Sequence, residues 1–492
     1  MPADNIPTTN QPQTTQGAQP SLVPPPFVGM VPPGQPTTSP PQAPQVAQGA
    51  PLPQDKKEGP VKKKPLVLIV ILFLLIVVGI VAFFSTRTTG DKKVSEKTTI
   101  VWWGLWEDEA TVSSVIDKYE ASNPNVEIKY VKQSKQDYRE RLTNLLAKKE
   151  GPDIFRFHNT WVPMFEGQLA PLPSTVISPA DYVQTFYPVA VSDLSNSTGT
   201  VGIPLEVDGL GLYINEAIFA ESGKVPPTTW DELKEVAKEL TITDENGLII
   251  QSGVSIGRTE NVDHWPEILA LMMLQNGADL NNPTGVAAQN ALSFFTSFSS
   301  EGIWDETLPF STTAFSGGKV AMYIGPSWRA FEITKLNPDL RFKVIPTPQL
   351  PGEDVFSKDI AYASYWAEGV WSGSKSVEES WKFLRYLSSQ ESLISLFDSA
   401  AKYRAFGEPY PRTDMAALLL SHPLAGAFIE QAKNYQSWYL ASNTFDGPTG
   451  INSQMNSYFK DAINYVNDNG DPADALVTVA QGVKQVLQQF EK

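Results

Sequence analysis

The chain has 492 residues, a formal net charge of −16 and no cysteine. Its length and 41% hydrophobic content allow more than one domain with a core of its own. The missing cysteine excludes disulfides, thiolate metal sites and cysteine nucleophiles. Residues 1–97 carry nine Lys and Arg against five Asp and Glu, which leaves 29 bases against 49 acids for the rest. Such an acidic body disfavours nucleic acid as a partner.

Residues 1–60 are rich in proline and small polar residues. They hold 16 of the 40 prolines, with Gln, Thr and Ala and almost no aromatic side chains. A segment of this composition cannot bury enough apolar surface to offset the entropy of ordering, so we expect a disordered tail. Its P-x-x-P strings could dock onto a proline-binding domain, whereas the plainer interpretation is a solvated tail.

A long apolar stretch follows this tail. Leu66–Phe84 contains 19 uncharged residues, enough to cross hydrocarbon as a helix that rises about 1.5 Å per residue. The exit, AFFSTRTTG, lacks a small-residue cleavage site. Residues 61–86 are therefore predicted to be an uncleaved anchor in the cell membrane rather than a cleaved signal or a core helix. Five lysines precede the stretch, which predicts a cytoplasmic N-terminus, a tether at 87–97 and an extracellular or periplasmic body.

The body begins with alternating strand and helix patterns. Strands are predicted at Thr98–Trp103, Val126–Tyr130 and Gly151–Phe157, and helices with one apolar face at Glu107–Ala121 and Gln136–Lys149. This β-α-β-α-β order favours an α/β fold with a mostly parallel sheet and helices on both faces. Ligands of such sheets bind beyond the carboxyl ends of the strands.

Aromatic and polar side chains fall at these carboxyl ends. The first strand runs into a loop with three tryptophans within five residues, Trp102, Trp103 and Trp106. Trp102 lies on the strand itself and is interpreted as core, whereas Trp106 lies beyond it. The third strand runs into HNTW, residues His158–Trp161. The binding crevice is therefore predicted at this edge of the sheet.

The remainder of the chain predicts further elements. Ile203–Phe219 indicates another strand between irregular ends, and Phe315–Trp328 indicates a strand that leads to a Gly-Pro turn. Thr229 and Glu232 have the spacing of a capping box at the start of a helix. Ser376–Glu391 predicts an amphipathic helix, and the last hundred residues are predicted to be helical.

Several strings of the body occur in an order typical of one family. They are the strand ending in WWG, PDIF with LAPL, IPLEVDGLGLYINEAIFAESG, LMMLQNGA, AFSGGKVAMYIGPSW and SWKFLRYLSSQE. Over about Thr98–Gln488 the chain resembles the carbohydrate-type extracellular solute-binding proteins of ABC importers, the group that includes the maltose-binding protein. Each string alone is weak, but six in register make the resemblance specific.

The resemblance implies a two-lobe, type II periplasmic-binding-protein-like body with a multi-strand hinge. Lobe one would comprise residues 98–206 and 348–402, and lobe two residues 207–347 and 403–492. It also implies a monomer that captures ligand between the lobes and delivers it to the permease subunits of an ABC importer. Two features depart from the family, because the membrane helix replaces its lipid-modified cysteine and the Pro-rich tail is foreign to it.

The resemblance further implies ligand-binding residues. The positions that match the family's cleft are Trp106, Glu107, Arg156, His158, Asn159, Asp208, Trp265 and Trp328. Trp366 in YASYWAEG and Trp438 in SWYLASN are further aromatic candidates. Trp371 and Trp381, by contrast, are interpreted as core.

An acidic cleft rich in tryptophan suits a sugar. Aromatic rings cover the apolar C–H face of a sugar, and carboxylates or amides pair with its hydroxyl rim. A polyamine would suit the same side chains through cation–π contacts, whereas a glycerophosphodiester would require more cationic donors than Arg156 and Arg329. A ligand sensor is a further alternative to a transport receptor.

The motifs disfavour an enzyme. A glycoside hydrolase needs two carboxyl groups about 5–9.5 Å apart, whereas Glu107 and Asp108 are neighbours that suit a helix N-terminus. The chain has no H-E-x-x-H or Walker A string, and TDENG lacks the ligands of a calcium loop. We therefore predict a binding protein without catalytic residues, metal or cofactor.

Overall fold

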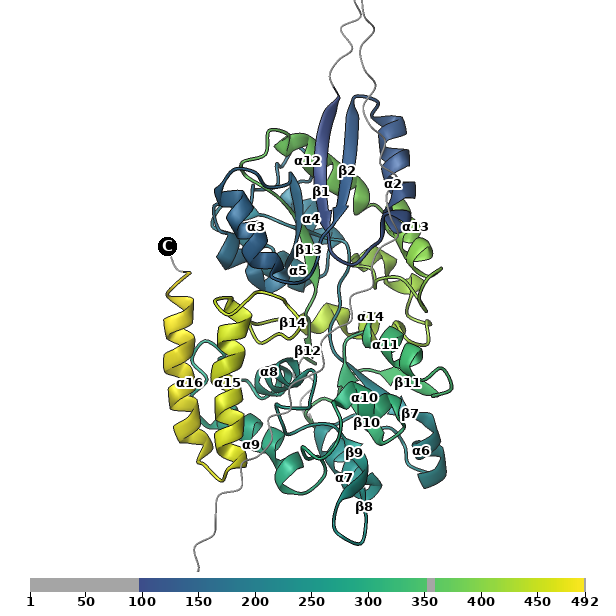
Figure 1. Ribbon diagram of the computed structural model, residues 1–492, viewed down its shortest axis with the longest axis vertical. Coiled ribbons are helices and arrows are strands. Elements are labelled where there is room, and N and C mark those ends of the chain that lie inside the picture. The colour runs from purple at the N-terminus through teal and green to yellow at the C-terminus, as the bar shows by residue number, and fades with distance from the viewer. Residues whose placement is uncertain (1–96, 352–358, 491–492) are drawn as a thin grey trace, which may run out of the picture. The chain divides into compact units, whose positions relative to one another are not determined.

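The computed structural model describes residues 97–351 and 359–490. The predicted tail at 1–60, the predicted membrane helix at 61–86 and the tether up to residue 96 lie outside these residues, so the anchor stays a prediction. No helix within the described ranges is long and apolar enough to cross a membrane. These ranges form two α/β lobes, each with a five-stranded sheet and its own hydrophobic core (Figure 1).

The first sheet confirms the predicted β-α-β-α-β unit. Strand β1 (Thr98–Gly104) pairs in parallel with both β2 (Val126–Lys132) and β3 (Ile154–His158). The connecting helices, α2 (Glu109–Ser122) and α3 (Tyr138–Ala147), each begin two residues later than predicted. The local periodicity of the sequence was therefore sufficient to place all five elements.

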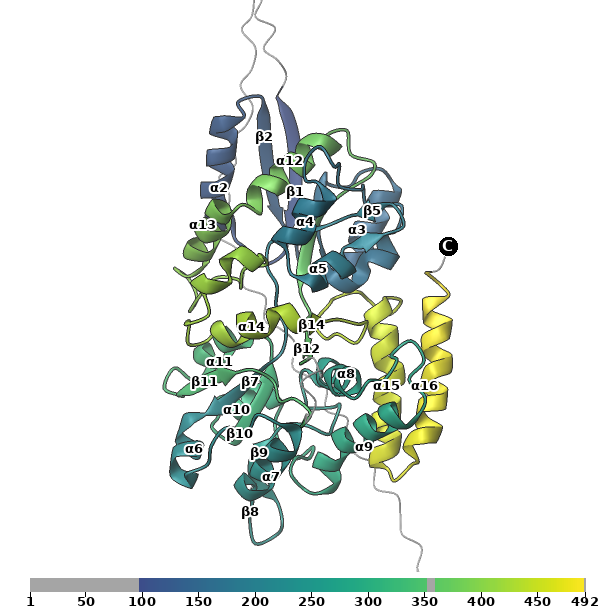
Figure 2. The same ribbon diagram turned by 180° about the vertical axis from the view of Figure 1, so that it is seen from behind.

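Strands from later in the chain complete this sheet. β13 (Trp366–Val370) runs antiparallel to β3 and to β6 (Ile203–Pro204), which gives the order β2-β1-β3-β13-β6. Helices α2 and α13 (Gln390–Ala400) lie on one side of the sheet, and α3 and α5 (Pro188–Asp193) lie on the other (Figures 1 and 2). The remaining elements of this lobe are η1 (Asn159–Phe165), α4 (Pro179–Thr185), β4 (Ser195–Asn196), β5 (Gly199–Thr200) and α12 (Val377–Leu387).

The three tryptophans predicted to be core residues are buried in the first lobe. Trp102 packs edge to face against Phe383 of α12, with ring centroids 5.7 Å apart. Trp371 and Trp381 are also buried in this lobe.

The second sheet has the order β11-β7-β10-β9-β8. Its strands are β7 (Gly211–Asn215), β8 (Ile242–Thr243), β9 (Ile249–Val254), β10 (Val320–Gly325) and β11 (Phe342–Ile345). The helices around it are α6 (Glu216–Ser222), α7 (Trp230–Leu240), α8 (Trp265–Gln275), α9 (Val286–Ser300), α10 (Ser311–Ser316) and α11 (Arg329–Leu336). The predicted capping box is present at α7, where Thr229 and Glu232 satisfy each other's backbone N–H.

The expectation of mostly parallel sheets is wrong. Three of the eight strand pairings in the two five-stranded sheets are parallel and five are antiparallel. The reason is the path of the chain between the lobes. β7 and β13 each begin where the chain passes from one lobe to the other. Their amino ends therefore lie beside the carboxyl ends of β10 and β3, and they are antiparallel to these neighbours.

The predicted strand at Ile203–Phe219 is two strands in different sheets. β6 belongs to the first lobe and β7 to the second, and residues 205–210 cross between them. The crossing residue Gly209 forms a β-bridge with Ala363. A Cβ atom on Gly209 would clash with the carbonyl oxygen of Tyr362, so this close approach of two backbones requires glycine.

Three segments cross between the lobes side by side. Besides residues 205–210, they include β12 (Ala361–Tyr362) and β14 (Tyr435–Gln436), which pair in parallel. Leu210 N donates to Tyr362 O at 3.0 Å, and Ala363 N donates to Gln436 O at 2.8 Å. Backbone hydrogen bonds therefore tie the three segments into one bundle.

The prediction of a helical C-terminal part is only partly correct. α15 (Ile451–Asn467) and α16 (Pro472–Leu487) pack against each other (Figure 1). Most of residues 401–450 is irregular, with the short elements η2 (Thr413–Leu418), α14 (Gly426–Gln431) and η3 (Ala432–Asn434). This segment supplies Met415 to the first core and Phe428 to the second, so its sequence follows no single helical period. The predicted lobe boundaries stay predictions.

Candidate functional site

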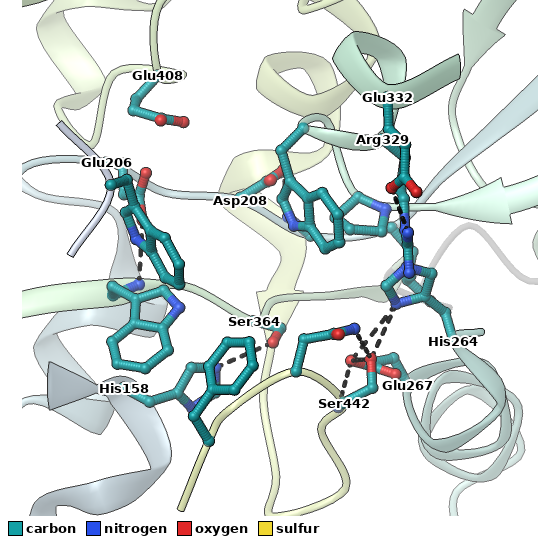
Figure 3. Close-up of a pocket in the computed structure, with 18 of the residues that line it drawn as sticks. His158, Glu206, Asp208, His264, Glu267, Arg329, Glu332, Ser364, Glu408 and Ser442 are labelled. Atoms are coloured by element: carbon teal, nitrogen blue, oxygen red, sulfur yellow. Dashed lines mark hydrogen bonds and ion pairs between the residues drawn. The ribbon is translucent and has the colours of Figure 1, made fainter. Parts of the chain in front are cut away.

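A cavity of about 360 Å³ lies between the two lobes (Figure 3). It opens where β1, β3 and β10 end, and the crossing segment with Glu206 and Asp208 forms part of its wall. Its aromatic side chains are Trp106, Trp328, Trp366 and Phe445. Its ionisable side chains are Lys135, His158, Glu206, Asp208, His264, Glu267, Arg329, Glu332, Arg404 and Glu408.

Aromatic rings face the cavity from both lobes. Trp106, in the loop after β1, meets Trp366 edge to face with ring centroids 5.5 Å apart. Trp366 is fixed in turn by Trp161, at 5.2 Å. Trp328 follows the Gly-Pro turn after β10 and packs against His264 at 5.7 Å. Aromatic rings on a cavity wall offer apolar surface to a flat ligand.

Five of the ten predicted site residues line this cavity: Trp106, His158, Asp208, Trp328 and Trp366. Burial lowers the pKa of His158 to about 3, so this side chain is a neutral hydrogen-bonding group. The structure does not bring the other five, Glu107, Arg156, Asn159, Trp265 and Trp438, to the cavity wall. Whether the five lining residues contact ligand stays a prediction.

Glu107 and Arg156 form a buried ion-pair network behind the wall. Arg156 lies 2.7 Å from Glu107 Oε2 through Nη1 and 2.7 Å from Glu368 Oε1 through Nη2. Burial opposes ionisation of Glu107, but the guanidinium of Arg156 holds the pKa of this carboxyl below its usual value. Both residues border a smaller cavity of about 30 Å³, shared with Glu206 and Glu408 of the main wall. Whether Glu107 and Arg156 contact ligand stays a prediction.

The other three predicted residues serve as packing or hydrogen-bonding groups. Asn159 donates to Asp193 Oδ2 at 2.9 Å and accepts from Tyr365 N at 3.2 Å. Trp265 is buried in the second core at the start of α8, and its neighbour His264 reaches the cavity instead. Trp438 donates to Asn281 Oδ1 at 3.1 Å and packs on Phe459.

Asp208 is a buried carboxylate held by neutral donors. It accepts hydrogen bonds from Gly209 N at 2.8 Å and from Ser327 Oγ at 2.8 Å. Burial raises the pKa of Asp208 to about 7, although these hydrogen bonds oppose the shift. Because Ser327 belongs to the second lobe's Gly-Pro turn, Asp208 also fixes this turn to the crossing segment.

The Asp208→Asn variant is expected to gain stability over the wild type as pH rises. The pKa of Asp208 is raised from 3.8 to about 7 in the folded state. Its contribution to the free energy of unfolding is therefore favourable at low pH and is lost as pH rises through this window. The loss is on the order of a few kcal/mol, and the amide does not incur it. Urea unfolding of both proteins between about pH 4 and pH 8 measures the difference. A difference independent of pH would contradict the raised pKa.

A directional hydrogen-bond chain on the second lobe was not predicted. Arg329 Nε donates to His264 Nε2 at 2.8 Å, so His264 carries its proton on Nδ1, which lies 3.0 Å from Ser442 Oγ. Ser442 Oγ donates to Glu267 Oε1 at 2.8 Å. In a serine nucleophile the histidine must accept the hydroxyl proton, whereas here it donates. The group therefore positions Glu267 and is not a catalytic triad.

A second serine also lacks the setting of a nucleophile. GVSIG, residues Gly253–Gly257, has the spacing of a nucleophile elbow. Ser255 is 1% exposed, and its Oγ has no hydrogen-bond partner within the described residues. A nucleophilic serine needs an adjacent base and access to substrate, so this string is structural.

Glu206, Glu408 and Arg404 are also cavity residues that the sequence analysis missed. Glu206 stands two positions before Asp208 in IPLEVDG. On an extended segment, side chains two residues apart point to the same side, so this spacing could have indicated that Glu206 lies near Asp208. Burial and the carboxylate of Glu408 raise the pKa of Glu206 well above its usual value. Within the described residues, no three or more His, Asp or Glu side chains are arranged so that they could hold a metal ion.

The two lobes also meet at one edge beside the cavity. Asn452, the second residue of α15, is fully buried, and its Oδ1 accepts from Thr160 Oγ1 at 3.0 Å and from Trp161 Nε1 at 3.2 Å. Nearby, Arg139 of α3 donates to Asp446 O. These contacts attach the start of α15 to the first lobe.

Two sheets flank a polar, aromatic cavity, and sequence comparison identifies the family to which this chain belongs. The model of the family described as bacterial extracellular solute-binding protein matches residues 103–393, more than half of the chain. The chain therefore belongs to this family. The resemblance noted from the sequence is confirmed, and proteins of this family bind solutes and are not enzymes.

Similar proteins include sequence relatives and solved structures. A maltotriose-binding protein of Pyrococcus abyssi is 28% identical over 143 residues, a match that spans 28% of this chain and 30% of that protein. The cyclic alpha-maltosyl-1,6-maltose binding protein of Arthrobacter globiformis has a TM-score of 0.64 at 18% identity, covering 80% of this chain and 100% of that one. The sugar-binding protein MalE of Xanthomonas citri has a TM-score of 0.63 at 18% identity, covering 80% and 98%. These structures show the two-lobe periplasmic-binding-protein-like fold.

Proposed function

We propose that the protein is the saccharide receptor of an ABC importer, which captures a sugar or oligosaccharide between its lobes and delivers it to the permease. The observation that carries the proposal is the cavity wall, to which one lobe contributes Trp106 and Trp366, the other lobe contributes Trp328, and both contribute carboxylates. Aromatic faces and charged acceptors are the two groups that a sugar ring requires. The cavity volume lies within the range of about 300–1,000 Å³ typical of small-molecule sites.

The relatives support a saccharide as the ligand class. The names of three similar proteins state that they bind maltotriose, a cyclic maltosyl-maltose and sugar. An anionic ligand is less suitable, because the wall has five acidic side chains against Lys135 and two arginines, and both arginines already hold their own carboxylates. Arg329 pairs with Glu332 at 2.5 Å, and Arg404 pairs with Glu408 at 2.6 Å.

The proposal includes a membrane anchor. Leu66–Phe84 would span the bilayer with the N-terminus in the cytoplasm, and the tether would hold the receptor close to its permease. A tether of about a dozen residues reaches at most about 40 Å. Release of the protein from membranes by detergent but not by high salt would test this part.

Ligand titration of the full chain tests the proposed function. The cavity tryptophans should change their fluorescence when a saccharide covers them. The full chain is purified in a detergent without a sugar headgroup and titrated with mono- and oligosaccharides, a polyamine and a glycerophosphodiester. We expect saturable binding of a saccharide and a rise in thermal stability, which amounts to about 2.7 kcal/mol at a hundredfold excess over Kd. Saturation by the polyamine alone, by the glycerophosphodiester alone, or by none of the compounds would contradict a saccharide receptor.

A further inference from the structure

The acids beside the cavity outnumber the bases that neutralise them. One contiguous cluster comprises the buried residues Glu206, Glu368 and Arg156 and the partly buried residues Glu107, Glu408 and Arg404. Arg156 binds Glu107 and Glu368, and Arg404 binds Glu408. Glu206 has no ion pair with any residue in 97–351 or 359–490. If all six groups were ionised, the cluster would carry two uncompensated negative charges, which is costly away from water.

Three members of the cluster, Glu206, Glu408 and Arg404, line the cavity, and Glu206 is the one without an ion pair within the described residues. It lines the wall and is 9% exposed. Its Oε1 accepts one long hydrogen bond, 3.4 Å, from Trp366 N (Figure 3). Burial and the facing Glu408 raise the pKa of Glu206, which favours a neutral carboxyl group. A ligand cation at this place would compensate the charge instead.

The ring of Trp106, which packs on Trp366, already holds an ammonium group. Trp366, whose backbone binds Glu206, packs edge to face on Trp106. The Nζ of Lys135 lies 4.5 Å from the ring centroid of Trp106 and 5.6 Å from that of Phe445. Within the described ranges Lys135 has no ion pair or side-chain hydrogen bond, so its ammonium group interacts with these two rings through cation–π contacts. Such aromatic walls bind cations through the ring quadrupole.

We propose that this end of the cavity is a subsite for a protonated amino group, formed by the carboxylate of Glu206 and the rings of Trp106 and Trp366, and that the ligand is an amine-bearing saccharide. The inference rests on the proposed function and narrows its ligand class. On binding, the ammonium of the ligand pairs with Glu206 and takes the place of Lys135 at the ring of Trp106. The proton on Glu206 leaves to solvent.

A neutral hydroxyl would not satisfy this subsite equally well. A hydroxyl can donate a hydrogen bond to Glu206, but it leaves the excess charge of the cluster unchanged. An ammonium group donates the same hydrogen bond and supplies a positive charge, and charge-assisted pairs are about twice as strong as neutral hydrogen bonds. The preference for amine over hydroxyl is therefore the property to be measured.

The test compares sugars that differ only in this group. The full chain is titrated by calorimetry with glucose, 2-amino-2-deoxyglucose and 6-amino-6-deoxyglucose, and with cello-oligosaccharides against glucosamine oligomers of equal length. We expect at least one amine-bearing sugar to bind tenfold or more tightly than its hydroxyl counterpart, about 1.4 kcal/mol. Its binding should release protons, seen as a dependence of the heat on the buffer.

Two variants place the effect at the subsite. Glu206→Gln keeps the shape of the side chain without the charge and should bring the amine-to-hydroxyl ratio of affinities to near one. Lys135→Met, at an exposed position, removes the competing ammonium and should raise this ratio several-fold. The matched control is Glu391→Gln, in an exposed ion pair with Lys118, which should keep the wild-type ratio.

The outcomes separate the inference from the proposed function. Neutral sugars that bind as well as their amine counterparts would overturn the amine subsite and leave the saccharide receptor standing. Failure of every sugar to bind would overturn both. A wild-type ratio in folded Glu206→Gln and in Lys135→Met together would show that any amine preference arises elsewhere, which also overturns the subsite.

Discussion

The Arg156→Met variant is expected to lose about 3–5 kcal/mol of unfolding free energy. Arg156 is the shared cation of Glu107 and Glu368, and its side chain is 5% exposed. Methionine fills similar space but leaves two buried carboxylates without a counter-charge. The loss of the counter-charge should cost more at Glu368 than at Glu107. Burial already raises the pKa of Glu368, and its Oε2 has no hydrogen-bond partner within the described residues. Urea unfolding followed by circular dichroism measures the loss.

An exposed ion pair provides the matched control for Arg156. Lys118 binds Glu391 at 3.1 Å, with side chains 51% and 75% exposed. The Lys118→Met variant should change the unfolding free energy by at most about 1 kcal/mol, because water solvates either partner alone. Equal losses in the two variants would show that the Arg156 network is no more important than a surface pair.

The Trp106→Ala variant is expected to weaken saccharide binding by about 2–4 kcal/mol, on the order of 30- to 1,000-fold in Kd. Its ring forms the cavity wall and contacts Trp366 and Phe445. Alanine removes an apolar face for the ligand and one of the two aromatic supports of Lys135. Calorimetric titration with the saccharide identified for the wild type measures the loss.

The control for Trp106 is a tryptophan close by in the sequence. Trp103 is partly buried at the end of β1 and is not among the residues that line the cavity. The Trp103→Ala variant should retain wild-type affinity within a few-fold while losing stability. A similar loss of affinity in both variants would indicate a general disturbance of the loop, and wild-type affinity in Trp106→Ala would place the ligand elsewhere.

The elements of the first lobe were predictable because their signals are local. Val112, Val115, Ile116 and Tyr119 repeat with the helical period, and all four are buried in α2. The capping box at Thr229 is likewise read within four residues. The prediction of a single strand at residues 203–219 was wrong because the hydrophobic residues of this region belong to two different cores. Its path between lobes depends on contacts with residues 361–363 and 435–436, and no local pattern records them.

The cavity was predictable in its location but only in part in its residues. The rule that ligands bind beyond the carboxyl ends of strands placed Trp106 and His158 correctly on the wall. Arg156 lies two residues before the end of β3, and its side chain belongs to a buried ion-pair network. Glu408 and Ser442 come from irregular segments that no periodicity describes. Side-chain direction at such positions is decided by tertiary packing.

The bundle of three crossing segments has a practical consequence for observing this receptor. Because the segments are hydrogen-bonded to one another, bending of one entails bending of all, and the opening of the molecule should follow a single coordinate. The chain contains no cysteine, so one cysteine introduced on each lobe, for example at the exposed positions Ser134 and Lys335, would accept a donor and an acceptor dye without background labelling. Energy transfer between the dyes would then report ligand occupancy in real time.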